Sequence, residues 1–136
     1  MPIYQCVAPE GAINHGLRGE LARELTRIHC EITGAAPEFV QVVFLDLPAG
    51  AAFVNGGKSA MTNIVGYMRA GRPPEMREQL LQRINLAWSQ LTSIPSAQLK
   101  ITLFDVPANW IMQGGHMMPE IGHDEEWLDQ TKAVRE

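Results

Sequence analysis

The chain has 136 residues, of which 46% are hydrophobic and 19% are charged, and its formal net charge at pH 7 is −4. This length and composition predict one globular domain with its own core and exclude a disordered chain. The eleven Lys and Arg residues are scattered, so the continuous basic surface that nucleic-acid binding requires is not expected. We find no apolar run of membrane length, no signal-peptide pattern and no CxxC spacing of the two cysteines. We therefore expect a reduced, soluble, cytoplasmic protein that binds neither nucleic acid nor membranes.

The chain begins Met1-Pro2, which is a candidate catalytic feature. Aminopeptidases usually remove an initiator methionine before a residue this small, and removal would leave Pro2 with a free secondary amine. An α-amino group has a pKa of about 8, and burial or a nearby cation lowers it. A proline amine near neutrality can act as a general base, a general acid or a nucleophile. Most Met-Pro starts have no such role, and a retained Met1 would make the Pro2 nitrogen a non-basic amide.

The first half of the chain predicts a strand, a helix and a second strand. An apolar alternation over residues 3–7 predicts the first strand, and Asn14 is placed to cap the helix. The helix is expected to end at Gly34. Its apolar stripe consists of Leu17, Leu21, Leu25, Ile28 and Ile32. A β-branched and aromatic run over 39–47, ended by Pro48-Ala49-Gly50, predicts the second strand.

The second half repeats this pattern at an offset of 59 residues, as from Leu17 to Met76. The run Asp46-Leu47-Pro48-Ala49 returns as Asp105-Val106-Pro107-Ala108, and residues 63–68 predict the matching first strand. The matching stripe consists of Met76, Leu80, Ile84, Ala87 and Leu91. Any α+β chain shows some agreement of this kind, but a shared tetrapeptide and a shared stripe at one offset favour a duplication.

We therefore predict an α+β fold in which two β-α-β units form a four-stranded sheet with both helices on one face. The units cover about 2–58 and 61–108 of a single domain, and a C-terminal tail covers 109–136. The uncovered face and the edge strands need a partner. The tail also holds more apolar side chains than a free tail should expose, so we expect it to pack on neighbouring subunits of an oligomer. These side chains are Trp110, Met112, Met117, Met118 and Trp127.

Six stretches of the chain carry a resemblance to a known family. They are Pro2-Ile3-Tyr4, residues 29–34, Pro48-Ala49-Gly50, Arg69-Ala70-Gly71-Arg72, Pro107-Ala108 and residues 119–127. Together they resemble the tautomerase superfamily, and within it the cis-3-chloroacrylic acid dehalogenase group. The resemblance spans essentially the whole chain. It implies subunits that fuse two β-α-β units and assemble as homotrimers, with no cofactor.

The resemblance also implies a role for each of four residues. Pro2 would be the general base or acid, Arg69 and Arg72 would hold a substrate carboxylate, and His29 would bind the carboxylate or a carbonyl. Two guanidiniums within one turn can present forked donors to a carboxylate, and their charge would lower the pKa of the Pro2 ammonium. Position alone favours plainer interpretations, in which the two arginines are solvated and His29 is a half-buried histidine with its own partner.

Two positions depart from the dehalogenase pattern. Gln113 stands where a water-activating glutamate is expected, and Thr102 stands where a tyrosine assists it; both are candidate substrate-binding residues here. Because Gln113 cannot ionise, it cannot serve as a base. We therefore expect keto–enol tautomerisation of a small 2-keto or 2-hydroxy-enoic acid. The alternatives are a hydratase or dehalogenase of 3-substituted acrylates or propiolates, and a carboxylate-binding protein without turnover.

Three further features predict no site. His116 and the run His123-Asp124-Glu125-Glu126 fit no metal pattern, so we expect a solvated acidic tail. The run Gly56-Gly57-Lys58-Ser59 lacks the upstream glycine of a phosphate-binding loop and predicts a mobile turn between the units. Cys30 follows His29 directly and lies about 100° further around the helix, so a Cys-His pair is not expected.

Overall fold

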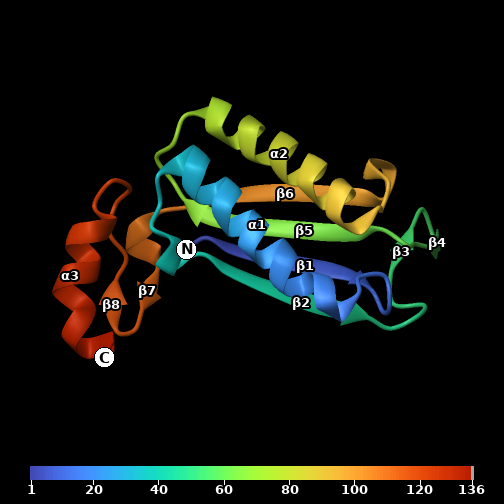
Figure 1. Cartoon of the computed structure of the whole chain (residues 1–136), viewed down its shortest axis with the longest axis horizontal. Coiled ribbons are helices and arrows are strands. Elements are labelled where there is room, and N and C mark those ends of the chain that lie inside the picture. Colours follow the sequence, from blue (N-terminus) through green and yellow to red (C-terminus); the bar gives the residue numbers. More distant parts are fainter. Residues whose placement is uncertain (136) are drawn as a thin grey trace.

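A computed structural model of the chain describes residues 1–135, and side chains as far as residue 132. Its centre is a four-stranded sheet in the order β2-β1-β5-β6 (Figure 1). The inner strands β1 and β5 are antiparallel, and each pairs in parallel with its outer neighbour. The bounds are Ile3–Pro9 for β1, Gln41–Leu47 for β2, Thr62–Arg69 for β5 and Leu99–Val106 for β6.

Two helices of 19 residues each, α1 (His15–Thr33) and α2 (Pro74–Thr92), cover one face of this sheet (Figure 1). Asn14 caps α1 by accepting a hydrogen bond from the Gly16 amide at 2.8 Å. Gly34 ends the helix in the left-handed conformation, with φ of 74°. The core between the layers contains Tyr4, Cys6, Leu21, Leu25, Ile28, Ile64, Met68, Leu80, Ile84 and Trp88. The predicted fold, with both helices on one face of a four-stranded sheet, is confirmed.

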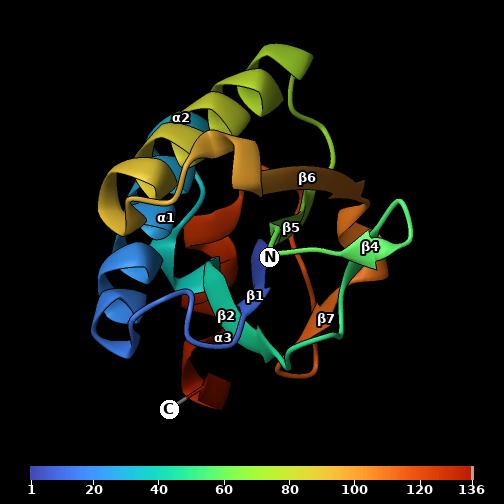
Figure 2. The same cartoon turned by 90° about the vertical axis from the view of Figure 1, so that its right-hand side faces the viewer.

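The 59-residue repeat extends beyond these elements. It relates α1 to α2 and the 3-10 turn at Pro37–Phe39 to the one at Ser96–Gln98. It also relates two short hairpins, each of which follows the last strand of its unit. Their strands are β3 (Phe53–Val54), β4 (Gly57–Lys58), β7 (Met112–Gln113) and β8 (His116–Met117). The labelled strands β4 and β7 lie on the side of the sheet away from α1 and α2 (Figure 2).

Two local predictions need correction. Phe39 does not begin the second strand: the rigid φ of Pro37 starts a 3-10 turn that ends at Phe39, and β2 begins at Gln41. The glycine-rich run at 56–59 does not form a simple turn, because Gly57 and Lys58 pair with β3 in a hairpin.

The C-terminal segment folds back on its own subunit. It forms a 3-10 turn at Ala108–Trp110, the β7–β8 hairpin and α3 (Asp124–Arg135), which lie at one end of the sheet (Figure 1). A second small core joins Phe39 to Met118 and Trp127, and the indole nitrogen of Trp127 donates to the Met117 carbonyl at 2.7 Å. The prediction of a solvated acidic tail is wrong for Asp124, which is 7% exposed.

The face of the sheet opposite the helices carries apolar side chains with no covering layer in the described part of the chain. Leu45 is 49% exposed and Phe104 is 48% exposed, and Phe104 stacks on Tyr67 with ring centroids 5.5 Å apart. None of the described helices is both long and apolar enough to cross a bilayer.

Candidate active site

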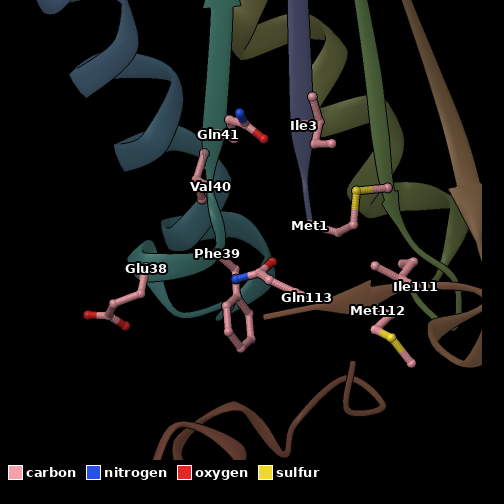
Figure 3. A pocket seen from close by; sticks show the side chains of 9 residues that line it. All are labelled: Met1, Ile3, Glu38, Phe39, Val40, Gln41, Ile111, Met112 and Gln113. Carbon is pink, nitrogen blue, oxygen red and sulfur yellow. The ribbon is translucent and has the colours of Figure 1, made fainter. Parts of the chain in front are cut away.

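The start of the chain lies at a pocket of about 400 Å³ at one end of the sheet (Figure 3). Three segments form its wall: the N-terminus, the link from the first 3-10 turn into β2, and the β7 strand with the residue before it. The lining residues are Met1, Ile3, Glu38, Phe39, Val40, Gln41, Ile111, Met112 and Gln113. Pro2 follows Met1 in the chain and is fully buried, and its nitrogen is an amide in this structure. The predicted residues Pro2 and Gln113 therefore lie at or beside one pocket.

His29 sits in the last turns of α1, on the face that packs against the sheet, and is completely buried. Its Nδ1 atom is 2.7 Å from the hydroxyl oxygen of Tyr4 on β1. The two rings meet edge to face, with centroids 5.7 Å apart. The Nε2 atom of His29 is also buried and has no hydrogen-bond partner among the described residues.

The Tyr4 contact selects one tautomer of His29. Burial raises the pKa of the Tyr4 phenol well above its usual range, so the phenol keeps its proton. Burial, followed by the charges of Arg72 and Arg69, lowers the pKa of His29 to about 3, so the imidazole is neutral at pH 7. If Tyr4 donates to Nδ1, only the Nε2–H lacks a partner; in the opposite arrangement, both the phenol proton and Nε2 lack one. His29 therefore presents an N–H donor at Nε2.

Arg69 ends β5 and is 1% exposed, because α3 covers it. Its Nη1 and Nη2 atoms donate to the two carboxylate oxygens of Asp124 at 2.9 and 3.0 Å. Nη1 also donates to the Pro119 carbonyl at 2.9 Å, and the guanidinium lies over the Phe39 ring at 5.1 Å. The Nε atom on the remaining edge of the guanidinium is buried and has no partner within the described chain.

Arg72 lies in the loop between β5 and α2 and is half-buried. Its Nη1 atom donates to the backbone carbonyl of Arg69 at 2.9 Å, which fixes one edge of its guanidinium. Its buried Nε atom has no partner in the part of the chain that the structure describes. Arg69 and Arg72 are therefore buried or half-buried, and neither is the freely solvated arginine of the plainer interpretation.

Three buried nitrogens of the predicted site residues thus have no partner among the described residues: His29 Nε2, Arg69 Nε and Arg72 Nε. None of these three residues is among the residues that line the pocket at Met1. The charges of Arg72, Arg69 and the chain's N-terminus all lower the pKa of His29, so these groups share one electrostatic environment. An unpaired buried donor costs about 1–3 kcal/mol, and an acceptor in the site would offset that cost. Donors of this kind suit a carboxylate or a carbonyl oxygen.

The N-terminal amine is the titratable group of this environment. Burial, followed by the charge of Arg69, lowers its pKa to about 6, and the charge of Asp124 opposes the change. In this structure the amine belongs to Met1. An amine with a pKa of this size is largely unprotonated at pH 7 and can accept a proton.

Residues 1–132 match the Tautomerase_3 family, described as "Putative oxalocrotonate tautomerase enzyme". The chain belongs to this family. No curated protein sequence matches it.

Solved structures support the same family. The chain shares 26% identity and a TM-score of 0.89 with N1, a member of the cis-3-chloroacrylic acid dehalogenase family, over 98% of each chain. It shares 32% identity and a TM-score of 0.79 with native Ps01740, over 82% of this chain and 99% of that one. A native fused 4-OT shows the same fold, with 23% identity and a TM-score of 0.76 over 85% of this chain and 94% of that one. The expected tautomerase superfamily and fold are confirmed.

The two departures from the dehalogenase pattern lie in different places in this Tautomerase_3 chain. Gln113 lines the pocket together with Met1. Thr102 lies on β6 opposite Val65, on the uncovered face of the sheet, and is not part of the pocket lining. Strand β5 separates β6 from β1, so about 10 Å of sheet lies between the strand of Thr102 and the strand that follows Pro2. Within one subunit the structure does not bring Thr102 to the site.

The 59-residue repeat of this chain carries the candidate site residues only once. At the 59-residue offset, Pro2 corresponds to Met61 and His29 to Trp88. Arg69, Arg72 and Gln113 correspond to Glu10, Ile13 and Val54. Trp88 is 1% exposed and stacks on Phe44, so an apolar side chain fills the position equivalent to His29. The repeat therefore does not produce a second set of these donors, and the single set combines Pro2 and His29 of the first unit with Arg69 and Arg72 of the second.

Sequence reasoning missed two residues of the site, Tyr4 and Asp124. Tyr4 is an inward-facing residue of the first strand, and its contact with His29 joins positions 25 residues apart. Asp124 reaches Arg69 across 55 residues. The strand alternation could have placed Tyr4 under α1, whereas no local signal distinguishes Asp124 from the acidic residues beside it.

Proposed function

We propose that this protein is a cofactor-independent tautomerase that moves a proton between oxygen and carbon in a small 2-keto or 2-hydroxy-enoic acid. The observation that supports this most is the set of three unpaired buried nitrogens whose residues share an electrostatic environment with the chain's N-terminus. They suit one carboxylate and an adjacent oxygen, and the amine beside them suits proton transfer.

The proposed reaction requires removal of Met1, which makes the Pro2 nitrogen a secondary amine. That amine takes the proton from the enol hydroxyl, which leaves an enolate. As the oxygen electrons form the C2 carbonyl, the electrons of the C2–C3 double bond take a proton from the prolinium at C3, which gives the 2-keto acid and restores the amine. The Nε atoms of Arg69 and Arg72 bind the carboxylate, and the Nε2–H of His29 donates to the C2 oxygen.

The site's electrostatics fit these roles. Burial and the charge of Arg69 lower the pKa of the amine that begins the chain, and they would act on a Pro2 amine in the same direction. His29 has a pKa of about 3, so it acts as a neutral donor and leaves proton transfer to the amine.

Ketonisation of phenylenolpyruvate, followed by ultraviolet absorbance, tests this proposal on protein whose intact mass shows that Met1 is absent. We expect turnover by the wild type and a loss of several orders of magnitude in Pro2→Ala, with an unchanged circular dichroism spectrum. Near wild-type turnover by folded Pro2→Ala would remove Pro2 from the mechanism. A wild type with no activity above buffer would leave this proposal without support.

A second candidate is a hydratase or dehalogenase of 3-substituted acrylates or propiolates. It is favoured by the structural similarity to N1 over nearly the whole chain and by Gln113, which lines the pocket and could orient a water molecule. Its amide cannot act as a base, so we expect this activity to be weak. Halide release from 3-chloroacrylates at a rate above ketonisation would favour this candidate. Carboxylate binding without turnover of either substrate class would indicate the third alternative, a binding protein.

We further propose a homotrimer that buries the uncovered face of the sheet. The apolar side chains on that face support this, as do the trimers named for two fused 4-OT structures of the same fold. In an oligomer, Thr102 of one subunit could contribute to a neighbouring site. Sedimentation at micromolar concentration should give three times the mass of the chain, and a monodisperse monomer would contradict the assembly.

A further inference from the structure

Asp124 is a buried carboxylate that the proposed reaction does not use. It is the first residue of α3, and it joins three parts of the molecule. Its Oδ1 and Oδ2 atoms accept from Arg69, and Oδ2 also accepts from the Ala36 amide at 2.8 Å. Burial alone would raise the pKa of its carboxyl, but these hydrogen bonds and the Arg69 charge hold that pKa below its usual value. Asp124 is therefore ionised at neutral pH.

The ion pair fixes the direction of the Arg69 guanidinium. A guanidinium is planar and rigid, so two bonds from Nη1 and Nη2 to Asp124 determine where its Nε edge points. That edge is the one left buried and unpaired. The position of the Arg72 side chain depends on Arg69, since Arg72 donates to the backbone carbonyl of Arg69. The chain of contacts from Asp124 through Arg69 to Arg72 thus connects α3 to the proposed carboxylate site.

The ion pair also sets the charge around the amine. Arg69 and Arg72 bring positive charge to this environment, His29 is neutral, and Glu38 lines the pocket beside the amine. Asp124 adds one negative charge next to Arg69, and it opposes the effect of Arg69 on the amine. Without Asp124, the Arg69 charge would have no ion-pair partner among the described residues.

We propose that Asp124 is a positioning residue, which aims the Nε edge of Arg69 into the site and offsets its charge so that the N-terminal amine remains basic enough to accept a proton. This inference rests on the proposed function. It assigns to α3 a part in catalysis, although none of its described side chains lines the pocket at Met1.

The direct test is a pH titration of the Pro2 amine by nitrogen-15 NMR on proline-labelled protein that lacks Met1. Removing a negative charge disfavours the ammonium, so Asp124→Asn should lower the amine pKa by about one unit. The same variant should raise KM for phenylenolpyruvate about tenfold, because Arg69 loses its orientation. An amine pKa equal to that of the wild type in folded Asp124→Asn would overturn the proposal.

Asp46→Asn is the matched control. Asp46 also pairs with an arginine, Arg18, at 2.8 Å, but it lies opposite Ala8, toward the far end of β1 from Pro2. This variant should leave both the amine pKa and KM unchanged. A shift equal to that of Asp124→Asn would show a general charge effect and would contradict the proposed role of Asp124.

Breaking a buried ion pair on one side can prevent folding. If Asp124→Asn does not fold, the double variant Arg69→Gln/Asp124→Asn removes both charges together. An offsetting pair predicts an amine pKa within about half a unit of the wild type, whereas a rise of about one unit or more would show that Asp124 offsets nothing. The titration does not depend on turnover. If the protein lacked tautomerase activity, the proposed function would be contradicted, and the titration would still test the role of Asp124.

Discussion

Replacing Tyr4 by phenylalanine removes one hydroxyl and tests how His29 is held. The hydroxyl is 2.7 Å from His29 Nδ1, and both side chains are completely buried. In the variant Nδ1 loses its partner, and an unsatisfied buried polar atom costs about 1–3 kcal/mol. We expect the free energy of unfolding, measured by urea denaturation, to fall by about this amount.

The same change should lower activity through the tautomer of His29. The hydrogen bond favours the Nε2–H form, and a bond of about 1.4 kcal/mol corresponds to a tenfold preference. We therefore expect kcat/KM for phenylenolpyruvate to fall about tenfold in Tyr4→Phe. The chain has one other tyrosine, Tyr67, on the uncovered face of the sheet, and Tyr67→Phe is the matched control. Equal stability and equal kcat/KM for Tyr4→Phe and wild type would refute the account of His29.

Three further predictions concern the same region. His29 has a folded-state pKa of about 3, below the usual value of about 6.5, so unfolding takes up a proton between these pH values. The free energy of unfolding should therefore fall by about 1.4 kcal/mol per pH unit as the pH drops through that window. His29→Gln should flatten this slope in urea titrations from pH 6.5 to 4.5; an unchanged slope would mean that His29 is not buried neutral. A Cβ at Gly66 would meet Leu103 at 2.7 Å and the rigid Tyr4 ring at 2.8 Å, so Gly66→Ala should cost about 1–3 kcal/mol of stability in thermal or urea unfolding, and a variant as stable as wild type would contradict that packing. Arg72→Met should raise KM for phenylenolpyruvate at least tenfold with a smaller change in kcat, and an unchanged KM would remove Arg72 from carboxylate binding.

The sequence predicted the features of this fold that local chemistry determines. Asn14 and Gly34 mark the ends of α1 because capping depends on neighbouring backbone groups. The second unit was detectable because the stripe and the strand-ending run are local patterns. The Phe39 prediction was wrong because β-propensity does not register the 3-10 turn that Pro37 begins, or the packing of Phe39 on Trp127.

The site was only partly predictable, for a different physical reason. Pro2, His29, Arg69 and Arg72 were identified by a family resemblance, and the structure shows that three of them retain unpaired buried nitrogens. What holds these groups is long-range: Tyr4 for His29, and Asp124 for Arg69. Such contacts depend on which residues the sheet and α3 bring together, and no spacing along the chain indicates them.

The most direct measurement of the central claim compares two forms of one sequence in the phenylenolpyruvate assay. One form lacks Met1 and has a free Pro2 amine, whereas the other retains Met1 and has an amide at the same atom. The account predicts turnover by the first form and none above buffer by the second. Equal turnover by both forms would contradict a mechanism in which the Pro2 nitrogen carries the proton.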